Sequence, residues 1–285
     1  MEKFYEWDYV KGKYIESVEN FEEWCREWKE RRPKELESSE YDDEYAELMR
    51  KWAYDDAPDE DGRKIFVFDG IINPEEWKKQ QVKILFVLKE AYDKSAHNDA
   101  GLYAWDESEW VLKQNGRIGK SKTWRRVYQW TKAILEQKSY SEIDDPKWDD
   151  GTLDKIAAIN IKKTNGKSRS VGEELREHAK RHSKELLAQI KTINPDVIVC
   201  GYTCWLLDSA LETASEEPVR TIKNDRWKYK TRSLSKNNEK EVTVIDFWHP
   251  ACMGEDKEIY EKLIESYNAI ISNEPESMDG ENDVK

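Results

Sequence analysis

Cysteine is scarce in this chain and is scattered where it does occur. The sequence has four cysteines, and no two of them form a Cys-x-x-Cys pair. A small fold stapled by disulfides needs more cysteines at short, regular spacing. We therefore expect reduced, structural thiols at the four positions, which are Cys25, Cys200, Cys204 and Cys252.

Long apolar runs and groups of metal ligands are lacking as well. No segment approaches the roughly 18 consecutive apolar residues of a membrane span, and the first residues lack the basic and apolar regions of a signal peptide. His178 and His182 have the i, i+4 spacing of metal ligands, but basic residues surround them and the sequence offers no evident third ligand. We therefore expect a monomeric, cytoplasmic protein that uses no metal or other cofactor and has no membrane partner.

The formal charge of −13 is unevenly spread along the chain. Residues 1–62 carry a net charge of −11 and residues 273–285 carry −4, which leaves +2 for residues 63–272. Because this middle region is close to neutral, the acidic total does not exclude a polyanionic ligand. The acidic tail at 273–285 is expected to be disordered.

Two helical patterns lie within the acidic first sixty residues. Aromatic and apolar residues recur at helical spacing from Phe21 to Trp28 and again from Tyr41 to Trp52. These patterns predict that residues 1–62 form a helical extension docked by its aromatic stripe. Its acidic outer face is either an ordinary solvated surface or a surface that binds a partner or mimics a nucleic-acid backbone.

Four short apolar runs predict the strands of a parallel sheet. The central one covers Ile84 to Leu88, and the others lie within residues 155–161, 195–201 and 242–247. Helical patterns separate the runs and follow the last one. Strands that alternate with helices predict an α/β protein, a three-layer α/β/α domain over residues 63–272 with a central, mainly parallel, four-stranded sheet.

Three of the four predicted strands end in a residue whose side chain could take part in catalysis or ligand binding. These residues are Glu90, Asn160 and His249. In a parallel sheet the carboxyl ends of the strands meet at one edge, so the three side chains are expected to line one cleft. Taken singly, each also has a structural interpretation: a solvated loop for Glu90, a hydrogen-bonded turn for Asn160, and a loop or core position for His249.

The order of these strand ends resembles the uracil-DNA glycosylase superfamily. Its members have an acid or amide motif after the first core strand, an Asn that ends the next strand, and a His-Pro-Ser type motif after the last. The matching segments here are Leu88-Lys89-Glu90-Ala91-Tyr92-Asp93, Ile159-Asn160-Ile161 and Trp248-His249-Pro250-Ala251. The likeness covers residues 83–271 and leaves the N-terminal segment unexplained.

The sequence departs from the family's motifs in several places. The first motif usually begins with Gly and contains Pro, and here it has neither. If Leu88 takes the place of the Gly, Glu90 falls where some members keep a water-positioning Asp and Tyr92 where they keep a Tyr beside the base. If Lys89 takes that place, Glu90 matches the Glu of another branch. Ala251 replaces a Ser that holds a DNA phosphate, and the four cysteines do not match the iron–sulfur branch.

The residue types suit cleavage of an N-glycosidic bond. As the bond breaks, the sugar gains oxocarbenium character and the base leaves as an anion. Glu90 can stabilise the cation and orient water, and His249 can donate to the oxygen of the base. Asn160 can read a Watson–Crick edge, but a rotatable amide fits uracil in one orientation and cytosine in the other. Asn160 alone therefore does not name the base.

The resemblance also implies contacts with flipped-out DNA. A flipped base would stack on an aromatic side chain, for which the candidates are Tyr92, Tyr103 and Trp105. Met253 could wedge into the base stack. Two basic segments leave the same sheet edge and are expected to contact phosphates. Their DNA-binding candidates are Lys120, Lys122, Arg125, Arg126, Lys162, Lys163 and Lys167.

The sequence therefore predicts a monofunctional DNA glycosylase that removes uracil or a modified base from single- or double-stranded DNA and leaves an abasic site. The motif departures and the irregular segment 93–115 favour an atypical base, including the bulky modified cytosines that phage-defence members remove. One alternative is a nucleic-acid-binding protein on the same scaffold that has lost catalysis. Another is a hydrolase of small nucleotides, for which binding would depend little on salt.

Overall fold

A computed structural model of the chain describes residues 3–8, 11, 13–17, 19–31, 39–55, 63–92, 101–113, 121–143, 150–166, 170–213, 221–223, 228–232 and 242–271. Within these ranges no helix has the length and apolar character needed to cross a membrane. The predicted tail at 273–285 lies outside the described residues.

A seven-stranded sheet forms the centre of the molecule, in the order β4-β7-β5-β8-β11-β10-β9. Its four middle strands are parallel: β7 (Ala157–Gly166), β5 (Ile84–Tyr92), β8 (Val197–Gly201) and β11 (Val242–Phe247). The predicted parallel four-stranded core is confirmed. Antiparallel strands extend it on both sides, namely β4 (Gly70–Ile71), β10 (Lys228–Arg232) and β9 (Thr221–Lys223).

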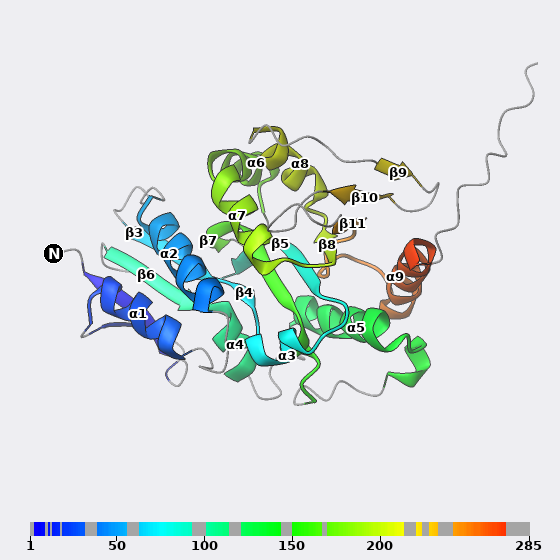
Figure 1. Ribbon diagram of the computed structural model, residues 1–285, viewed down its shortest axis with the longest axis horizontal. Coiled ribbons are helices and arrows are strands. Elements are labelled where there is room, and N and C mark those ends of the chain that lie inside the picture. Colours follow the sequence, from blue (N-terminus) through cyan, green and yellow to red (C-terminus); the bar gives the residue numbers. More distant parts are fainter. Residues whose placement is uncertain are drawn as a thin grey trace, which may run out of the picture.

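Helices cover both faces of this sheet, which confirms the three-layer arrangement (Figure 1). On one face lie α5 (Lys122–Glu136) and α9 (Asp256–Ile271), packed on apolar side chains of alternate strand positions such as Phe86. On the other lie α6 (Gly172–Arg181), α7 (Ser183–Ile193) and α8 (Cys204–Thr213). Two short helices, α3 (Pro74–Lys78) and α4 (Glu107–Lys113), lie at the β4 side.

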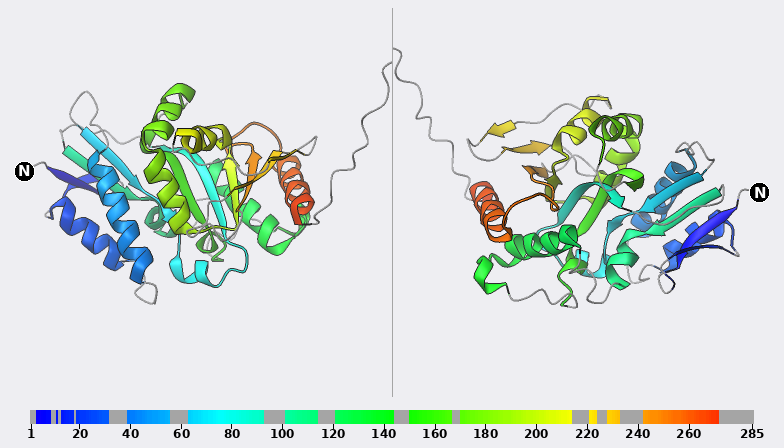
Figure 2. Two further views of the ribbon diagram at one scale, coloured as in Figure 1. Left: turned by 45° about the horizontal axis from the view of Figure 1, so that its top comes forward. Right: turned by 180° about the vertical axis from the view of Figure 1, so that it is seen from behind.

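A second sheet lies beside the first and corrects the prediction of a purely helical N-terminal extension (Figure 2). Its order is β2 (Lys13–Glu16), β1 (Phe4–Asp8), β6 (Gly101–Asp106) and β3 (Arg63–Phe68). The helical prediction holds for α1 (Phe21–Arg31) and α2 (Ser39–Asp55) but is wrong for Phe4–Asp8 and Lys13–Glu16, which form the antiparallel strands β1 and β2. Strand β6 pairs in parallel with both β1 and β3, so the sheet joins chain segments far apart in sequence.

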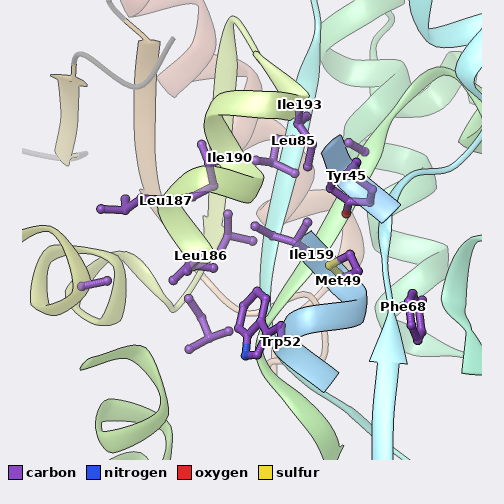
Figure 3. Close-up of a cluster of buried hydrophobic side chains, with 14 of the residues drawn as sticks. Tyr45, Met49, Trp52, Phe68, Leu85, Ile159, Leu186, Leu187, Ile190 and Ile193 are labelled. Carbon is purple, nitrogen blue, oxygen red and sulfur yellow. The ribbon is translucent and has the colours of Figure 1, made fainter. Parts of the chain in front are cut away.

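The N-terminal helices share one hydrophobic core with the central sheet. Tyr45, Met49 and Trp52 of α2 belong to the same cluster of buried side chains as Ile190 of α7 and as Leu85 and Ile159 of the central strands (Figure 3). The described residues of α1 and α2 are therefore part of the main packing unit and not a separate attachment.

Candidate active site at the carboxyl edge of the parallel strands

The strand register places Glu90, Asn160 and His249 at one edge of the central sheet. Leu88 pairs with Asn160, Val87 pairs with Cys200, and Cys200 pairs with Asp246. Asn160 therefore lies level with Leu88, and Glu90 and His249 each lie two residues beyond that level. From the strand rise and spacing, the Cα atoms of Glu90 and Asn160 are about 8 Å apart.

The chain after β11 folds back over β8 toward β5. Gly201 allows this approach, because a Cβ there would lie 3.0 Å from Cδ of Pro250 and 3.3 Å from Cδ2 of Leu88. The ammonium of Lys89, next to Glu90, is near enough to His249 to lower its pKa. The predicted meeting of the β5 and β11 strand ends therefore has support from both packing and electrostatics.

His249 is held as a neutral imidazole. Burial, and then the charge of Lys89, lower its pKa to about 4 from the usual 6.5. The backbone N–H of Ala251 donates to Nδ1 of His249 over 3.1 Å. Because Nδ1 accepts, the single ring proton of the neutral form belongs on Nε2, which makes this atom a hydrogen-bond donor.

A buried arginine fixes the loop that carries His249. The guanidinium of Arg126 donates to the carbonyl oxygens of Pro250, Cys252 and Gly254 at 2.8–3.0 Å, and its Nε donates to Asp256 at 2.9 Å. Arg126 is completely buried. Its predicted role as a phosphate contact is therefore wrong, since its donors are used within the protein.

Two residues near Arg126 in α5 also bind the loop that carries His249 and the start of α9. Nζ of Lys122 donates to the carbonyl of Cys252 over 2.7 Å, and Arg125 forms an ion pair with Asp256 at 2.9 Å. Arg125 and Lys122 remain partly exposed, so a phosphate contact from them stays a prediction. Lys120 and Lys167 lie outside the described residues.

Glu90 lies at the strand edge in an ion pair that the sequence did not reveal. Its Oε2 is 3.4 Å from Nζ of Lys162, which also bonds Glu174 of α6. The side chains of Glu90 and Lys162 are only 6% and 8% exposed. Lys162 therefore pairs with the predicted catalytic acid, and a DNA contact by Lys162 stays a prediction.

Glycine at position 166 makes room for the Glu90 side chain. A Cβ on Gly166 would overlap Cγ of Glu90 and lie 2.6 Å from its Cδ. We expect Gly166→Ala to shift the carboxylate and lower any Glu90-dependent base release about 100-fold, because small displacements of a catalytic group are costly. Single-turnover assays would measure this. Gly172→Ala, whose Cβ would meet nothing closer than 3.7 Å, is the control, and equal rates for the two variants would contradict the prediction.

Asn160 belongs to a buried polar network at the junction of the two sheets. Its backbone N–H donates to Oδ2 of Asp69 at 2.7 Å, and its Nδ2 donates to Oδ2 of Asp69 at 3.2 Å and to Oε2 of Glu107 at 2.7 Å. On the other side of Asp69, Oδ1 accepts from Lys163 at 2.6 Å and from Gln189 at 2.8 Å. Lys163 and Asp69 have no exposed side-chain surface, so the predicted DNA contact by Lys163 is wrong.

Sequence reasoning missed two titratable residues of this network, Asp69 and Glu107. Burial raises the pKa of Glu107 to about 8, and the negative charge of Asp69 adds to the shift. Neither Asp69 nor Glu107 follows one of the four recognised strands. Asp69 does directly follow Ile65 to Phe68, an apolar run that the sequence also predicts as a short strand and that lies in β3, and that position was the available signal.

The predicted base-stacking residues have different fates. Tyr103 is buried and stacks on Tyr5 at 4.5 Å between ring centroids, so its prediction as a stacking surface for a flipped base is wrong. Trp105 is partly exposed and packs edge-on against Trp110, so its role stays a prediction. Tyr92 lies in β5, but its side chain is outside the described set.

Exposed apolar side chains gather where β8 and β11 end. Met253 is 91% exposed, and its insertion into a base stack stays a prediction. Tyr202 and Trp248 are exposed as well and were not predicted. Lysine ammonium groups lie 4.9 Å from each of their ring centroids, Lys89 over Tyr202 and Lys262 over Trp248. Such flat, cation-flanked rings suit contacts with nucleobases.

Within the described ranges, no three His, Cys, Asp or Glu side chains are grouped as a metal site would require. Comparisons of this chain with protein-family models, with curated proteins and with solved structures found no match.

Proposed function

We propose that the protein is a DNA glycosylase that hydrolyses the N-glycosidic bond of a flipped base at the carboxyl edge of β5, β7 and β11. The observation that carries the proposal is the register, which puts Glu90 and His249 two residues beyond the level of Asn160. An acid on β5 and an amide on the adjacent β7 thus lie at the same sheet edge as a neutral imidazole that follows β11, with β8 between β5 and β11, and their order in the chain resembles the uracil-DNA glycosylase superfamily.

The roles follow from charge development during bond cleavage. A carboxylate at Glu90 stabilises positive charge on the sugar and orients the attacking water. The Nε2–H of His249 donates to the base oxygen on which negative charge develops. A neutral donor suits this task, because an imidazolium would transfer its proton too readily to act as a lasting hydrogen-bond donor.

The pH dependence of His249 tests this role directly. Because its pKa in the folded state, about 4, lies below the usual 6.5, protonation favours the unfolded chain. Its contribution to stability is complete above pH 6.5 and is lost as the pH falls toward 4. We expect NMR of the four histidines to show one ring that titrates near pH 4 and whose signals vanish in His249→Gln. Titration of that ring near 6.5 would contradict the neutral-donor role.

One observation favours the alternative of a nucleic-acid-binding protein without catalysis. The Glu90 side chain is 94% buried and one of its oxygens already faces Lys162, so a substrate must compete for the carboxylate. In this alternative the exposed rings at Tyr202 and Trp248 would bind bases, and the strand edge would serve only as a scaffold.

The deciding experiment incubates the protein with single- and double-stranded DNAs that carry uracil, hypoxanthine or modified cytosines, and then probes for alkali-labile abasic sites. A glycosylase releases at least one of these bases. Glu90→Gln, purified in the same way, controls for contaminating glycosylases. Salt-dependent DNA binding without any abasic sites would support the binding protein, and binding that is insensitive to salt would count against DNA as the ligand.

A further inference from the structure

We propose that Glu107 supplies the hydrogen-bond donor that reads the flipped base, next to an acceptor supplied by Asn160. The inference rests on the proposed function and deepens it. The base expected at the site has a Watson–Crick edge with one donor and one acceptor side by side. In the sequence-based prediction the Asn160 amide pairs with both groups, whereas here the protein's donor comes from Glu107.

The orientation of the Asn160 amide is fixed by its neighbours. Its Nδ2 faces carboxylate oxygens of both Asp69 and Glu107. Turning the amide over would set Oδ1 against the same two oxygens, and Asp69 is already paired with Lys163 at 2.6 Å. Both amide protons of Asn160 are therefore used within the network. Among the described residues Oδ1 has no hydrogen-bond partner, so Asn160 offers a base an acceptor only.

Reading a base edge with two hydrogen bonds then needs a donor from another residue. Glu107 is the direct neighbour, and its Oε2 accepts the Asn160 bond. Burial favours the protonated acid at neutral pH, because its pKa is raised to about 8. Since Oε2 accepts, the acid proton belongs on Oε1, which has no partner among the described residues. Oδ1 of Asn160 and the hydroxyl of Glu107 thus form an acceptor and a donor.

The depth of this pair fits the reacting centre. Asn160 and Glu90 belong to adjacent strands, and Glu90 lies two residues nearer the carboxyl edge; the Asn160 side chain meets Glu107 of α4, whereas the Glu90 carboxylate meets Lys162, which bonds Glu174 of α6. The Cα separation of about 8 Å along and across the strands is one that a nucleobase and its sugar can span. The base edge would meet Asn160 and Glu107 while the glycosidic carbon meets Glu90.

Other charged groups lie around Glu107, and a pH experiment must distinguish their titration from that of Glu107. They are Asp69 from the end of β3, Lys163 of β7 and Asp106 beside Glu107 in the chain. Burial lowers the pKa of Lys163, so loss of its proton could also weaken base binding in alkali. Glu107→Gln separates the two causes. A glutamine oxygen still accepts from Asn160, and its NH₂ group is a donor at every pH, whereas the titration of Lys163 would remain.

The test measures how much of DNA affinity depends on the base. Fluorescence anisotropy gives the Kd for oligonucleotides that carry uracil or cytosine and for the same strand with a tetrahydrofuran abasic analogue, in the Glu90→Gln background to prevent cleavage. The ratio of the abasic Kd to the base Kd is followed from pH 6 to 9, below the ionisation of the uracil imide itself. We expect this ratio to fall about tenfold above pH 8 for one of the two bases, the size of one buried hydrogen bond that is lost. It should stay constant when Glu107→Gln is added.

Glu109→Gln on the same helix is the matched control and should keep the alkaline fall. A ratio that falls equally with and without Glu107→Gln, or one that shows no base dependence at any pH, overturns the inference. The two proposals fail separately. If the protein releases a base but the Kd ratio does not change with pH, only the assignment of Glu107 is wrong. If the Kd ratio falls as expected but no DNA loses a base, only the proposed glycosylase activity is wrong.

Discussion

Replacing Glu90 by glutamine is expected to slow base release about 1000-fold while leaving DNA affinity within a few-fold of the wild-type value. Glutamine has nearly the same shape, so the fit against Gly166 is kept. It carries no negative charge for the oxocarbenium-like sugar and is a poor partner for the attacking water, and groups of this kind contribute about 10²–10⁴-fold. Single-turnover kinetics on the substrate found by the DNA panel would measure the loss, and anisotropy would measure the binding.

The structure offers a matched control for this variant in Glu174. Its carboxylate is the other partner of Lys162, but its side chain is 42% exposed and it lies on α6. Glu174→Gln therefore changes the pairing of the same lysine without touching the proposed catalytic acid. A loss of similar size in both variants would mean that the Lys162 cluster acts only by holding the strand edge together, and would remove the catalytic role of Glu90.

Replacing Lys163 by methionine is expected to destabilise the fold by about 3–5 kcal/mol and to lower the melting temperature by roughly 10 °C. Lys163 and Asp69 form a fully buried ion pair with an N–O distance of 2.6 Å. Removing the ammonium leaves a carboxylate with no access to water and no counterion. Asn160 and Gln189 still donate to Asp69, but neutral donors do not replace the lost charge. Denaturant and thermal unfolding would measure the change.

A double variant tests whether the cost comes from the stranded charge. Lys163→Met with Asp69→Asn removes both charges and should be more stable than Lys163→Met alone. Lys79→Met, which breaks the exposed pair with Glu76, should have little effect on stability. If the double variant loses as much stability relative to the wild type as the two single variants lose together, the two side chains do not interact as the structure indicates.

The central sheet could be predicted because each of its parallel strands is a local signal. Buried runs such as Ile84 to Leu88 are apolar at every position and end abruptly in polar residues. The hairpin of β1 and β2 could not, because short strands such as Lys13–Glu16 are half polar and have no such pattern. Strand β6 gave no periodic signal either, and its pairing with β1 joins segments about a hundred residues apart.

Charge was the less reliable guide to the site. The basic residues around Arg126 and Lys162 were expected on the surface, where lone lysines and arginines usually lie. Their partners stand far away in the sequence: Asp256 is 130 residues beyond Arg126, and Asp69 is 94 residues before Lys163. A sequence shows the cation but not which distant carboxylate or carbonyl it will meet. The ends of β5 and β11 were predicted because a parallel sheet fixes where strands end.

The hydrogen bonds of Tyr45 bear on what happens when the molecule is cut. Its hydroxyl donates to the carbonyl of Asp69 and accepts from Gln189 at 2.6 Å, so one phenol ties together α2, the exit of β3 and α7. A fragment that begins at residue 63 lacks Tyr45, so the side-chain amide of Gln189 and the carbonyl of Asp69 would lose this hydrogen-bond partner and face an unfilled cavity. Helix α2 is thus needed to complete the buried core, and we expect a fragment that begins at residue 63 to be insoluble when it is expressed alone.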